Sequence, residues 1–322
     1  EVYMEALRII IPQRFKHQRL DVALAEMLPN YSRSKIASWI KSGDALINNK
    51  GFKPKDRAIG SEIVTIKINL KQNTNWIAEE IILNIVYEDD DIIVINKPYG
   101  LVTHPGAGNW SGTLANALLH YDPQLSKLDR AGIVHRLDKN TSGLMVVAKN
   151  LQSQKNLVEQ LQTHSVRREY SAIVYGHMIS GGTVNEPIGR DPKDRIKQAV
   201  TSIGKDAVTH YRIIDRYANH THVKVILETG RTHQIRVHLS HIGYPLIGDL
   251  VYGGKLRFPK KAGIEIKDAL KAFQRQALHS KQLSLNHPED GRLMTWKVDL
   301  PDDMKKLLAV LKIKINNQNT KI

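Results

Sequence analysis

The sequence predicts an α+β fold, with a mixed, mainly antiparallel sheet in a large domain and a small α/β module before it. After residue 81, strand patterns outnumber helix patterns and do not alternate regularly with them, which argues against a doubly wound parallel sheet. A polar stretch at 71–80 has few core-forming residues and is typical of a linker. We therefore expect one domain at 17–75 and a second at 81–315.

The small module should begin with an amphipathic helix. Its apolar residues recur at i, i+3, i+4, i+7 and i+8, which places them on one face: Leu20, Ala23, Leu24, Met27 and Leu28. Pro29 and Asn30 follow directly and should end the helix.

A second short helix and two strands should complete this module. Ser32 can cap the helix, and Ile36, Trp39 and Ile40 would form its buried face. Strands are expected at 45–48 and at 62–68, where apolar and polar residues alternate. The basic side chains fall on the polar sides of the module: Arg19, Arg33, Lys35 and Lys41.

The larger domain shows clear strand and helix patterns along its length. Short apolar runs rich in β-branched residues predict strands at 92–95, 144–147, 171–175 and 223–227. Helical periodicity predicts helices at 151–162, 232–242 and 301–311.

The overall charge indicates a polyanionic partner. The chain of 322 residues has 47 Lys and Arg against 32 Asp and Glu, a formal net charge of +15. Nucleic acid is the expected partner of so basic a chain, although a merely soluble basic protein would have the same composition.

The cysteine content and the hydropathy of the chain limit its possible cellular compartment and its possible active-site chemistry. The chain has no Cys, which excludes disulfides, thiolate nucleophiles and cysteine-ligated metal sites and suits a reducing cytoplasm. No apolar run approaches the roughly 20 residues of a membrane span, and no signal-peptide pattern is present. We expect a cytoplasmic protein that has no contact with membranes.

Asp138 is the strongest candidate for a chemical role. It lies in a polar loop that precedes the strand pattern at 144–147, between the basic residues His135, Arg136 and Lys139. Nearby positive charge favours an ionised carboxylate, which can act as a nucleophile toward a sugar or a base. The simpler alternative is a surface Asp that neutralises a basic loop.

Three runs resemble the motifs of the RluA-type pseudouridine synthases and occur in the family's order. They are HRLDKNTSGL at 135–144, REYSAIVYG at 168–176 and LETGRTHQIRVHLSHIGYPLIGDLVYGG at 227–254. The run RLDVALAEMLPNYSRSKIASWIKSGDALINNK at 19–50 is similar to an S4 RNA-binding domain. The resemblance implies a pseudouridine synthase fold for the larger domain and an S4-like RNA-binding domain before it.

The resemblance also implies roles for residues of the first two motifs. Asp138 would be the catalytic nucleophile, and Arg136 would enter the RNA in place of the flipped base. Tyr170 would stack on the target base and assist proton removal from C5. Without the family, Tyr170 would be an ordinary core aromatic residue of a strand.

The third motif implies two further site residues. Thr232 can cap the helix that follows, which would leave Arg231 just before the helix and free to reach into a cleft. The resemblance implies that Arg231 pairs with Asp138 through a bidentate bond. It also places Ile235 under the uracil. The alternative for Arg231 is a surface cation at a helix end.

The S4 resemblance assigns RNA contacts to the second helix of the small module. The matching candidates are Arg33, Lys35 and Lys41. An ordinary solvated basic helix face is the alternative.

The implied reaction is isomerisation of uridine in 23S ribosomal RNA, whether free or in a pre-ribosomal large subunit. The N1–C1′ bond breaks and the uracil is rejoined through C5, so substrate and product are isomers and we expect neither cofactor nor metal. Attack of Asp138 on C1′ or on C6 remains open. No obligate protein partner is indicated, and we expect a monomer.

Four alternatives compete with this interpretation. A related synthase could modify other uridines of ribosomal RNA, and a non-catalytic RNA-binding assembly factor would share the charge and the S4-like module. A metal site at His233, His238 and His241 is disfavoured because Arg236 lies among them and no acidic ligand does. An aspartyl-phosphate enzyme is suggested only faintly by the sequence DKNTSG.

Overall fold

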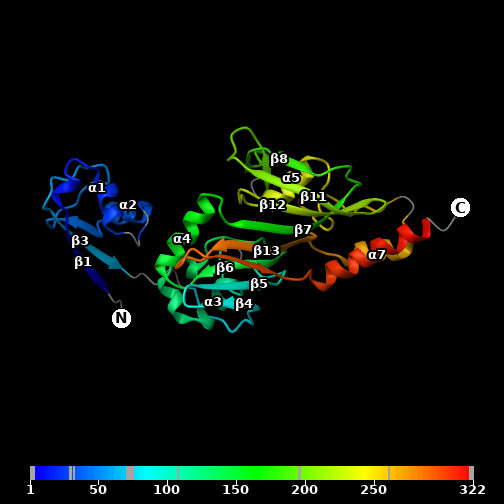
Figure 1. Ribbon diagram of the computed structural model, residues 1–322, viewed down its shortest axis with the longest axis horizontal. Helices are drawn as coiled ribbons and strands as arrows, with labels where there is room; N and C mark the ends of the chain where they lie inside the picture. The colour runs from blue at the N-terminus through cyan, green and yellow to red at the C-terminus, as the bar shows by residue number, and fades with distance from the viewer. Residues whose placement is uncertain are drawn as a thin grey trace.

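The computed structural model describes residues 4–28, 31, 33–69, 76–106, 109–194, 197–259 and 262–318. The described chain forms two units, an N-terminal one and a larger one (Figure 1). Of the expected linker, residues 71–75 lie outside the described residues. Residues 76–80 belong to the larger unit, since Trp76 packs against its core and Asn116 Nδ2 donates to the carbonyl of Ile77 at 2.7 Å.

The N-terminal unit combines two helices with a three-stranded antiparallel sheet in the order β1-β3-β2. Its elements are β1 (Met4–Ile10), α1 (Leu20–Met27), α2 (Arg33–Ser42), β2 (Ala45–Ile47) and β3 (Ile63–Asn69). The two predicted helices are confirmed, and the residues of their apolar faces form one buried cluster with Val64 and Ile66. Pro29, Asn30 and the expected cap Ser32 lie outside the described residues.

Strand β1 extends this unit to the N-terminal side of residue 17, where the first domain was expected to begin. It pairs with β3 along its whole length, from Met4 opposite Asn69 to Ile10 opposite Ile63. No strand was predicted here because three consecutive isoleucines, residues 9–11, interrupt the apolar–polar alternation that is typical of strands.

The larger unit is built on a nine-stranded sheet in the order β4-β5-β6-β13-β7-β12-β11-β8, with β14 paired to β13. Its strands are β4 (Ile85–Glu88), β5 (Ile92–Lys97), β6 (Ser142–Ala148), β7 (Arg167–Tyr175), β8 (Gly182–Asn185), β11 (Val208–Arg216), β12 (His220–Leu227), β13 (Leu278–Asn286) and β14 (Leu293–Lys297). Strands β9 (Ile188–Arg190) and β10 (Gln198–Val200) form a separate pair. Only β6 and β13 pair in parallel among the described strands, so the predicted mixed, mainly antiparallel sheet is confirmed.

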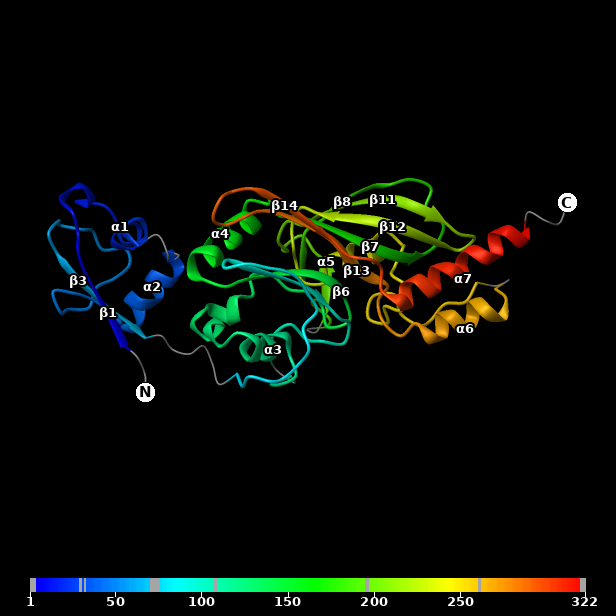
Figure 2. The same ribbon diagram turned by 60° about the horizontal axis from the view of Figure 1, so that its bottom comes forward.

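Helices cover both faces of this sheet, and α3 and α4 lie on opposite sides (Figure 2). The helices are α3 (Leu114–Tyr121), α4 (Leu151–Gln162), α5 (Gln234–His241), α6 (Ile264–Ala272) and α7 (Asp302–Gln318). The main core cluster contains side chains of α3 and α5, and a second cluster on the other face contains Leu157 of α4 and Trp296. In the described part of the chain, no helix has both the length and the apolar character to cross a membrane.

Helix α5 begins later than predicted. His233 immediately before it has φ 57°, a left-handed conformation, and no side chain caps the helix. The predicted cap by Thr232 is therefore wrong, because a left-handed residue separates Thr232 from the first helical residue, Gln234. By contrast, α4 has the predicted bounds.

Candidate active site

A buried lysine anchors the loop that carries Asp138. The Lys97 ammonium donates to the carbonyls of Pro98 (2.9 Å), Leu101 (2.8 Å) and Lys139 (3.2 Å). These three acceptors match the three N–H donors of an ammonium group. Burial lowers the pKa of Lys97 to about 7, while the charge of Asp138 acts in the opposite direction. Lys97 was not predicted as a site residue, although a Lys at the end of a buried apolar strand is a usable signal.

Two further hydrogen bonds fix the shape of this loop. The buried Thr103 hydroxyl donates to the carbonyl of Leu137 at 2.8 Å. Within the loop, the backbone N–H of Thr141 donates to the carbonyl of Asp138 at 3.0 Å. The backbone is thus held on both sides of the Asp138 side chain, four residues before β6 begins.

The cation that pairs with Asp138 is Arg236 of α5. Arg236 Nη1 donates to Asp138 Oδ2 at 3.0 Å, while its Nε and Nη2 bind the Asp249 carboxylate at 2.7 and 3.0 Å. Burial acts to lower the pKa of Arg236, but the hydrogen bonds and charges of Asp249 and Asp138 raise it above its ordinary value. Asp249 therefore fixes the guanidinium plane so that the remaining nitrogen points at Asp138.

The predicted pairing of Arg231 with Asp138 is wrong. Arg231 lies before α5, and its Nε donates to the carbonyl of Asp206 at 2.9 Å. Arg236 instead lies in the first turn of α5, on the buried side that also carries Ile235. The motif contains both arginines, and the sequence analysis treated Arg236 only as an obstacle to metal binding. Its position beside the apolar stripe was the signal that it faces inward.

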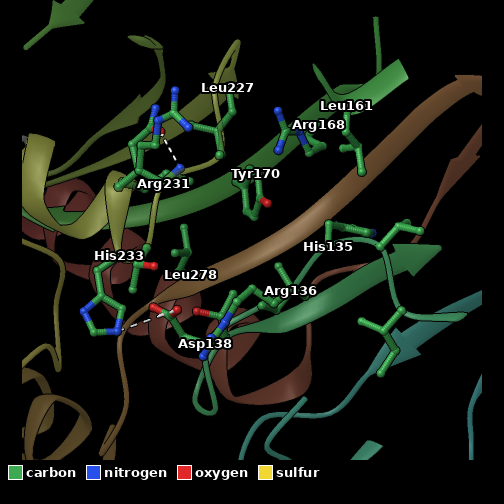
Figure 3. A pocket seen from close by; sticks show the side chains of 18 of the residues that line it. His135, Arg136, Asp138, Leu161, Arg168, Tyr170, Leu227, Arg231, His233 and Leu278 are labelled. Carbon is green, nitrogen blue, oxygen red and sulfur yellow. Dashed lines mark hydrogen bonds and ion pairs between the residues drawn. The ribbon is translucent and has the colours of Figure 1, made fainter. Parts of the chain in front are cut away.

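His233 approaches the other carboxylate oxygen of Asp138. Its Nε2 lies 3.8 Å from Asp138 Oδ1, and its Nδ1 lies 2.6 Å from the Tyr252 hydroxyl. The Tyr252 oxygen already accepts the backbone N–H of Gln198 at 3.0 Å, which leaves its own proton free to point at Nδ1. Burial lowers the pKa of His233, against the opposing charge of Asp138. If Nδ1 accepts this proton, a neutral ring carries its own proton on Nε2. Figure 3 shows the His233 ring facing Asp138.

Tyr252 contacts both neighbours of Asp138. Besides the bond to His233, its ring lies under the Arg236 guanidinium at 4.9 Å. Asp249 and Tyr252 both belong to the run GDLVYGG, which the sequence analysis quoted without assigning roles to its residues.

The predicted catalytic-domain residues line one pocket of about 620 Å³. They are Arg136, Asp138, Tyr170, Arg231 and Ile235. Tyr170 and Ile235 are buried, whereas Arg136 is exposed. Burial raises the pKa of Tyr170, so its hydroxyl is protonated at neutral pH. Asp138 is the sole carboxylate among the described lining residues, which also include five arginines.

The predicted RNA-binding residues of the N-terminal unit lie outside this pocket. Arg33, Lys35 and Lys41 are exposed on α2. Arg33 also binds the buried Asp21 at 2.9 Å, as Arg19 does at 3.1 Å. Burial would raise the pKa of Asp21, but these hydrogen bonds lower it below its ordinary value. Arg33 thus has a structural role that the sequence analysis did not foresee.

The histidines weighed as metal ligands are engaged differently. His238 uses both ring nitrogens, with Thr209 Oγ1 at 2.8 Å and the carbonyl of Glu186 at 2.9 Å. His233 faces Asp138 and Tyr252, as described above. Neither ring is free to turn toward a common metal ion without losing these bonds.

Comparisons with known proteins show which family the chain resembles. A family model described as RNA pseudouridylate synthase matches residues 91–241. The chain is 53% identical over 296 residues to the ribosomal large subunit pseudouridine synthase D of Yersinia pestis, covering 92% of this chain and 91% of the relative. It is 48% identical over 303 residues to the protein of that name from Xanthomonas campestris pv. campestris, covering 94% and 92%. Among solved structures, human RNA Pseudouridylate Synthase Domain Containing 4 has TM-score 0.56 and 28% identity, over 71% of this chain and 93% of that one.

Proposed function

The chain belongs to the RNA pseudouridylate synthase family, and on this premise we propose that it isomerises uridines in large-subunit ribosomal RNA with Asp138 as the nucleophile. The position of the Asp138 carboxylate in the pocket supports its assignment as the nucleophile. Asp138 is the one carboxylate among the described pocket-lining residues, and Arg236 and His233 flank its two oxygens. A carboxylate held in this way keeps one orientation toward a bound nucleotide.

The reaction requires a nucleophile and rotation of the base, and its substrate and product are isomers of one nucleotide. The N1–C1′ bond breaks, the uracil turns, and C5 bonds to C1′. The C5 proton leaves, N1 takes up a proton, and the bond that Asp138 formed to the nucleotide breaks to regenerate the carboxylate. Asp138 attacks either C1′ of the ribose or C6 of the base. Arg236 holds the carboxylate during attack, and Tyr170 stacks on the uracil above the apolar Ile235. We propose that a group lining the same pocket removes the proton from C5.

Entry of the base requires that it leave the RNA helix. Flipping costs a few kcal/mol, and stacking on Tyr170 returns about 1–3 kcal/mol. The exposed Arg136, at the mouth of the pocket, would fill the space that the base leaves in the RNA. We propose that 23S ribosomal RNA, free or in a pre-ribosomal large subunit, is the partner of a cytoplasmic monomer that needs no cofactor.

The N-terminal unit is proposed to be an S4-like RNA-binding domain. Its support is the sequence resemblance together with the exposed basic side chains of α2, Lys35 and Lys41 among them. Phosphate contacts of such residues add affinity that falls with salt. A non-catalytic assembly factor would bind RNA in the same way, so only turnover distinguishes the two functions.

Asp138→Asn tests the assignment directly. The amide keeps the volume of the side chain but is not an anionic nucleophile, so we expect loss of isomerisation with the fold and the RNA affinity retained. Pseudouridine formed in unmodified large-subunit ribosomal RNA, with no added cofactor or metal, is the measurement. Glu289→Gln, which changes an exposed carboxylate that does not line the pocket, is the matched control.

Two outcomes would contradict the proposal in different ways. An Asp138→Asn enzyme that retains more than a small fraction of the wild-type rate removes Asp138 from the role of nucleophile. A wild-type protein that binds this RNA and forms no pseudouridine supports the assembly factor instead.

A further inference from the structure

Arg168 is a buried cation for which the described residues provide no ion pair. It is 6% exposed, on β7, and its Nη2 donates to the carbonyl of Glu228 at 3.1 Å. Its Nε is buried and has no hydrogen-bond acceptor within the described structure. Burial lowers the pKa of this guanidinium, which is the direction expected of a charge that lacks a partner.

The other buried arginines of the described chain are paired. Arg236 binds two carboxylates, and Arg275, 4% exposed, binds both oxygens of Asp303 at 2.6 and 2.9 Å. Burying a charge without a counter-charge is costly, so the fold neutralises these two arginines internally. Arg168 differs from both, and its missing partner is expected to come from outside the protein.

Arg168 lines the same pocket as Asp138. It lies two residues before Tyr170 on β7, and alternate residues of a strand share one face. Figure 3 shows Arg168 beside Tyr170, on the side of the pocket that Leu161 also lines. The guanidinium therefore lies beside Tyr170 in the pocket lining, where it can contact a nucleotide whose base stacks on that ring.

Gly230 keeps this space open for the guanidinium. A Cβ at position 230 would overlap Arg168 Nη1. The backbone at Gly230 therefore packs directly against the Arg168 guanidinium, and a side chain at position 230 would displace that group. A buried donor group thus lies against the backbone of Gly230, within the lining of the pocket.

We infer that Arg168 is a binding site for an oxygen of the bound nucleotide, either a phosphate oxygen or a carbonyl oxygen of the uracil. This inference rests on the proposed function, because it takes RNA as the ligand. A guanidinium suits both kinds of acceptor, since its planar fork can donate two parallel hydrogen bonds to oxygen. Two other arginines of the pocket lie nearer to solvent: Arg136 is exposed and Arg231 is half-buried. Arg168 would therefore contact the part of the nucleotide that lies deepest in the pocket.

Arg168→Met tests the site, with Arg275→Met as the matched control. Methionine fills similar space without charge, so the free Arg168→Met protein should melt at or above the wild-type temperature. Arg275→Met instead leaves the Asp303 carboxylate without its counter-charge, and this variant should melt at a lower temperature. Affinity for unmodified large-subunit ribosomal RNA and the single-turnover rate at saturating enzyme are then measured across a range of salt concentrations.

The two oxygen sources give different results. A phosphate contact predicts at least a tenfold loss of affinity and a decrease of about one in the slope of log affinity against log salt. A uracil contact predicts at least a tenfold loss of single-turnover rate with the salt slope unchanged. Arg168→Lys keeps a charge without the fork and should show the same defect in weaker form.

The inference fails if Arg168→Met binds and turns over RNA within twofold of wild type at every salt concentration. Should that variant not fold, the same result for Arg168→Lys overturns it. Failure of the proposed function is recognised separately, because the wild-type enzyme would then form no pseudouridine at all.

Discussion

Arg236 is the residue on which the geometry of Asp138 depends most directly. Arg236→Ala leaves Asp138 and Asp249 without their shared counter-charge, and removing one partner of a buried ion pair costs about 3–5 kcal/mol. We expect a less stable protein and a steep loss of single-turnover rate, with Arg236→Lys between Ala and wild type because it keeps only the charge.

Arg231→Ala is the comparison for Arg236→Ala. Arg231 lines the pocket but contacts a backbone carbonyl rather than Asp138, so its removal should lower RNA affinity modestly and leave the protein stable. Equal rates for Arg236→Ala and wild type at saturating enzyme would refute the role given to the pair of Arg236 and Asp138.

The Tyr252 hydroxyl should contribute to the pH dependence of the site, in addition to the burial that lowers the pKa of His233. It donates to Nδ1 of His233, which only the neutral ring can accept, so Tyr252→Phe should raise the pKa of His233 from its lowered value. A protonated ring beside Asp138 would compete for the carboxylate. The rate of the variant should therefore fall further below wild type as the pH is lowered to about 6.

Single-turnover rates across pH measure this effect. Tyr244→Phe is the control, since Tyr244 is half-buried and does not line the pocket. A Tyr252→Phe profile that is lowered equally at every pH would indicate a packing role and contradict the tautomer argument.

At the scale of elements, sequence patterns predicted what faces a core and missed what is buried but polar. The apolar runs at β5 and β6 and the amphipathic α4 were identified from their residues alone. Strand β13 was missed because its buried residues include His279 and Ser280, which hydrogen-bond to Ser142 and to the carbonyl of Leu144 in β6. Such partners come from distant segments, so no local pattern reveals them.

The junction of β6 with β13 should be sensitive to a single methyl group. Gly143 has φ 116°, and a Cβ there would overlap the backbone of Ser280. Gly143→Ala should therefore lower the free energy of unfolding in urea by about 1–3 kcal/mol through overpacking, beyond any cost of the positive φ. Gly291→Ala, at φ 70° in open space, measures the conformational cost alone. Equal losses for the two variants would contradict the close approach.

At the scale of the whole molecule, the two units have separate cores. The buried cluster of the N-terminal unit contains only residues before 70, and the clusters of the larger unit contain only residues after 75. Deleting residues 1–75 should therefore leave the larger unit folded, with weaker RNA binding, a flatter salt dependence and some activity at high RNA concentration. Unchanged affinity and salt slope would show that the N-terminal unit has another role.

The composition and the three motifs predicted a basic protein whose pocket gathers Asp138, Tyr170 and Ile235. They did not determine which arginine of the third motif pairs with Asp138. That choice depends on where α5 begins, and the left-handed backbone of His233 sets this start. Likewise, the sequence could not show that Arg168 lacks an ionic partner. Three-dimensional packing decides this, because it leaves Arg168 unpaired with any carboxylate of the described chain.

The parallel pairing of β6 with β13 has a consequence for the timing of synthesis. It joins Ser142 to His279, 137 residues further along the chain. A contact that closes so long a loop forms late in folding, and it cannot form at all before β13 has been translated. At about 5–20 residues per second, translation separates the two strands by roughly 7–30 s. The strand that follows the loop of Asp138 therefore lacks its β13 partner during this interval, and a nascent chain contains Asp138 well before the pocket around it is complete.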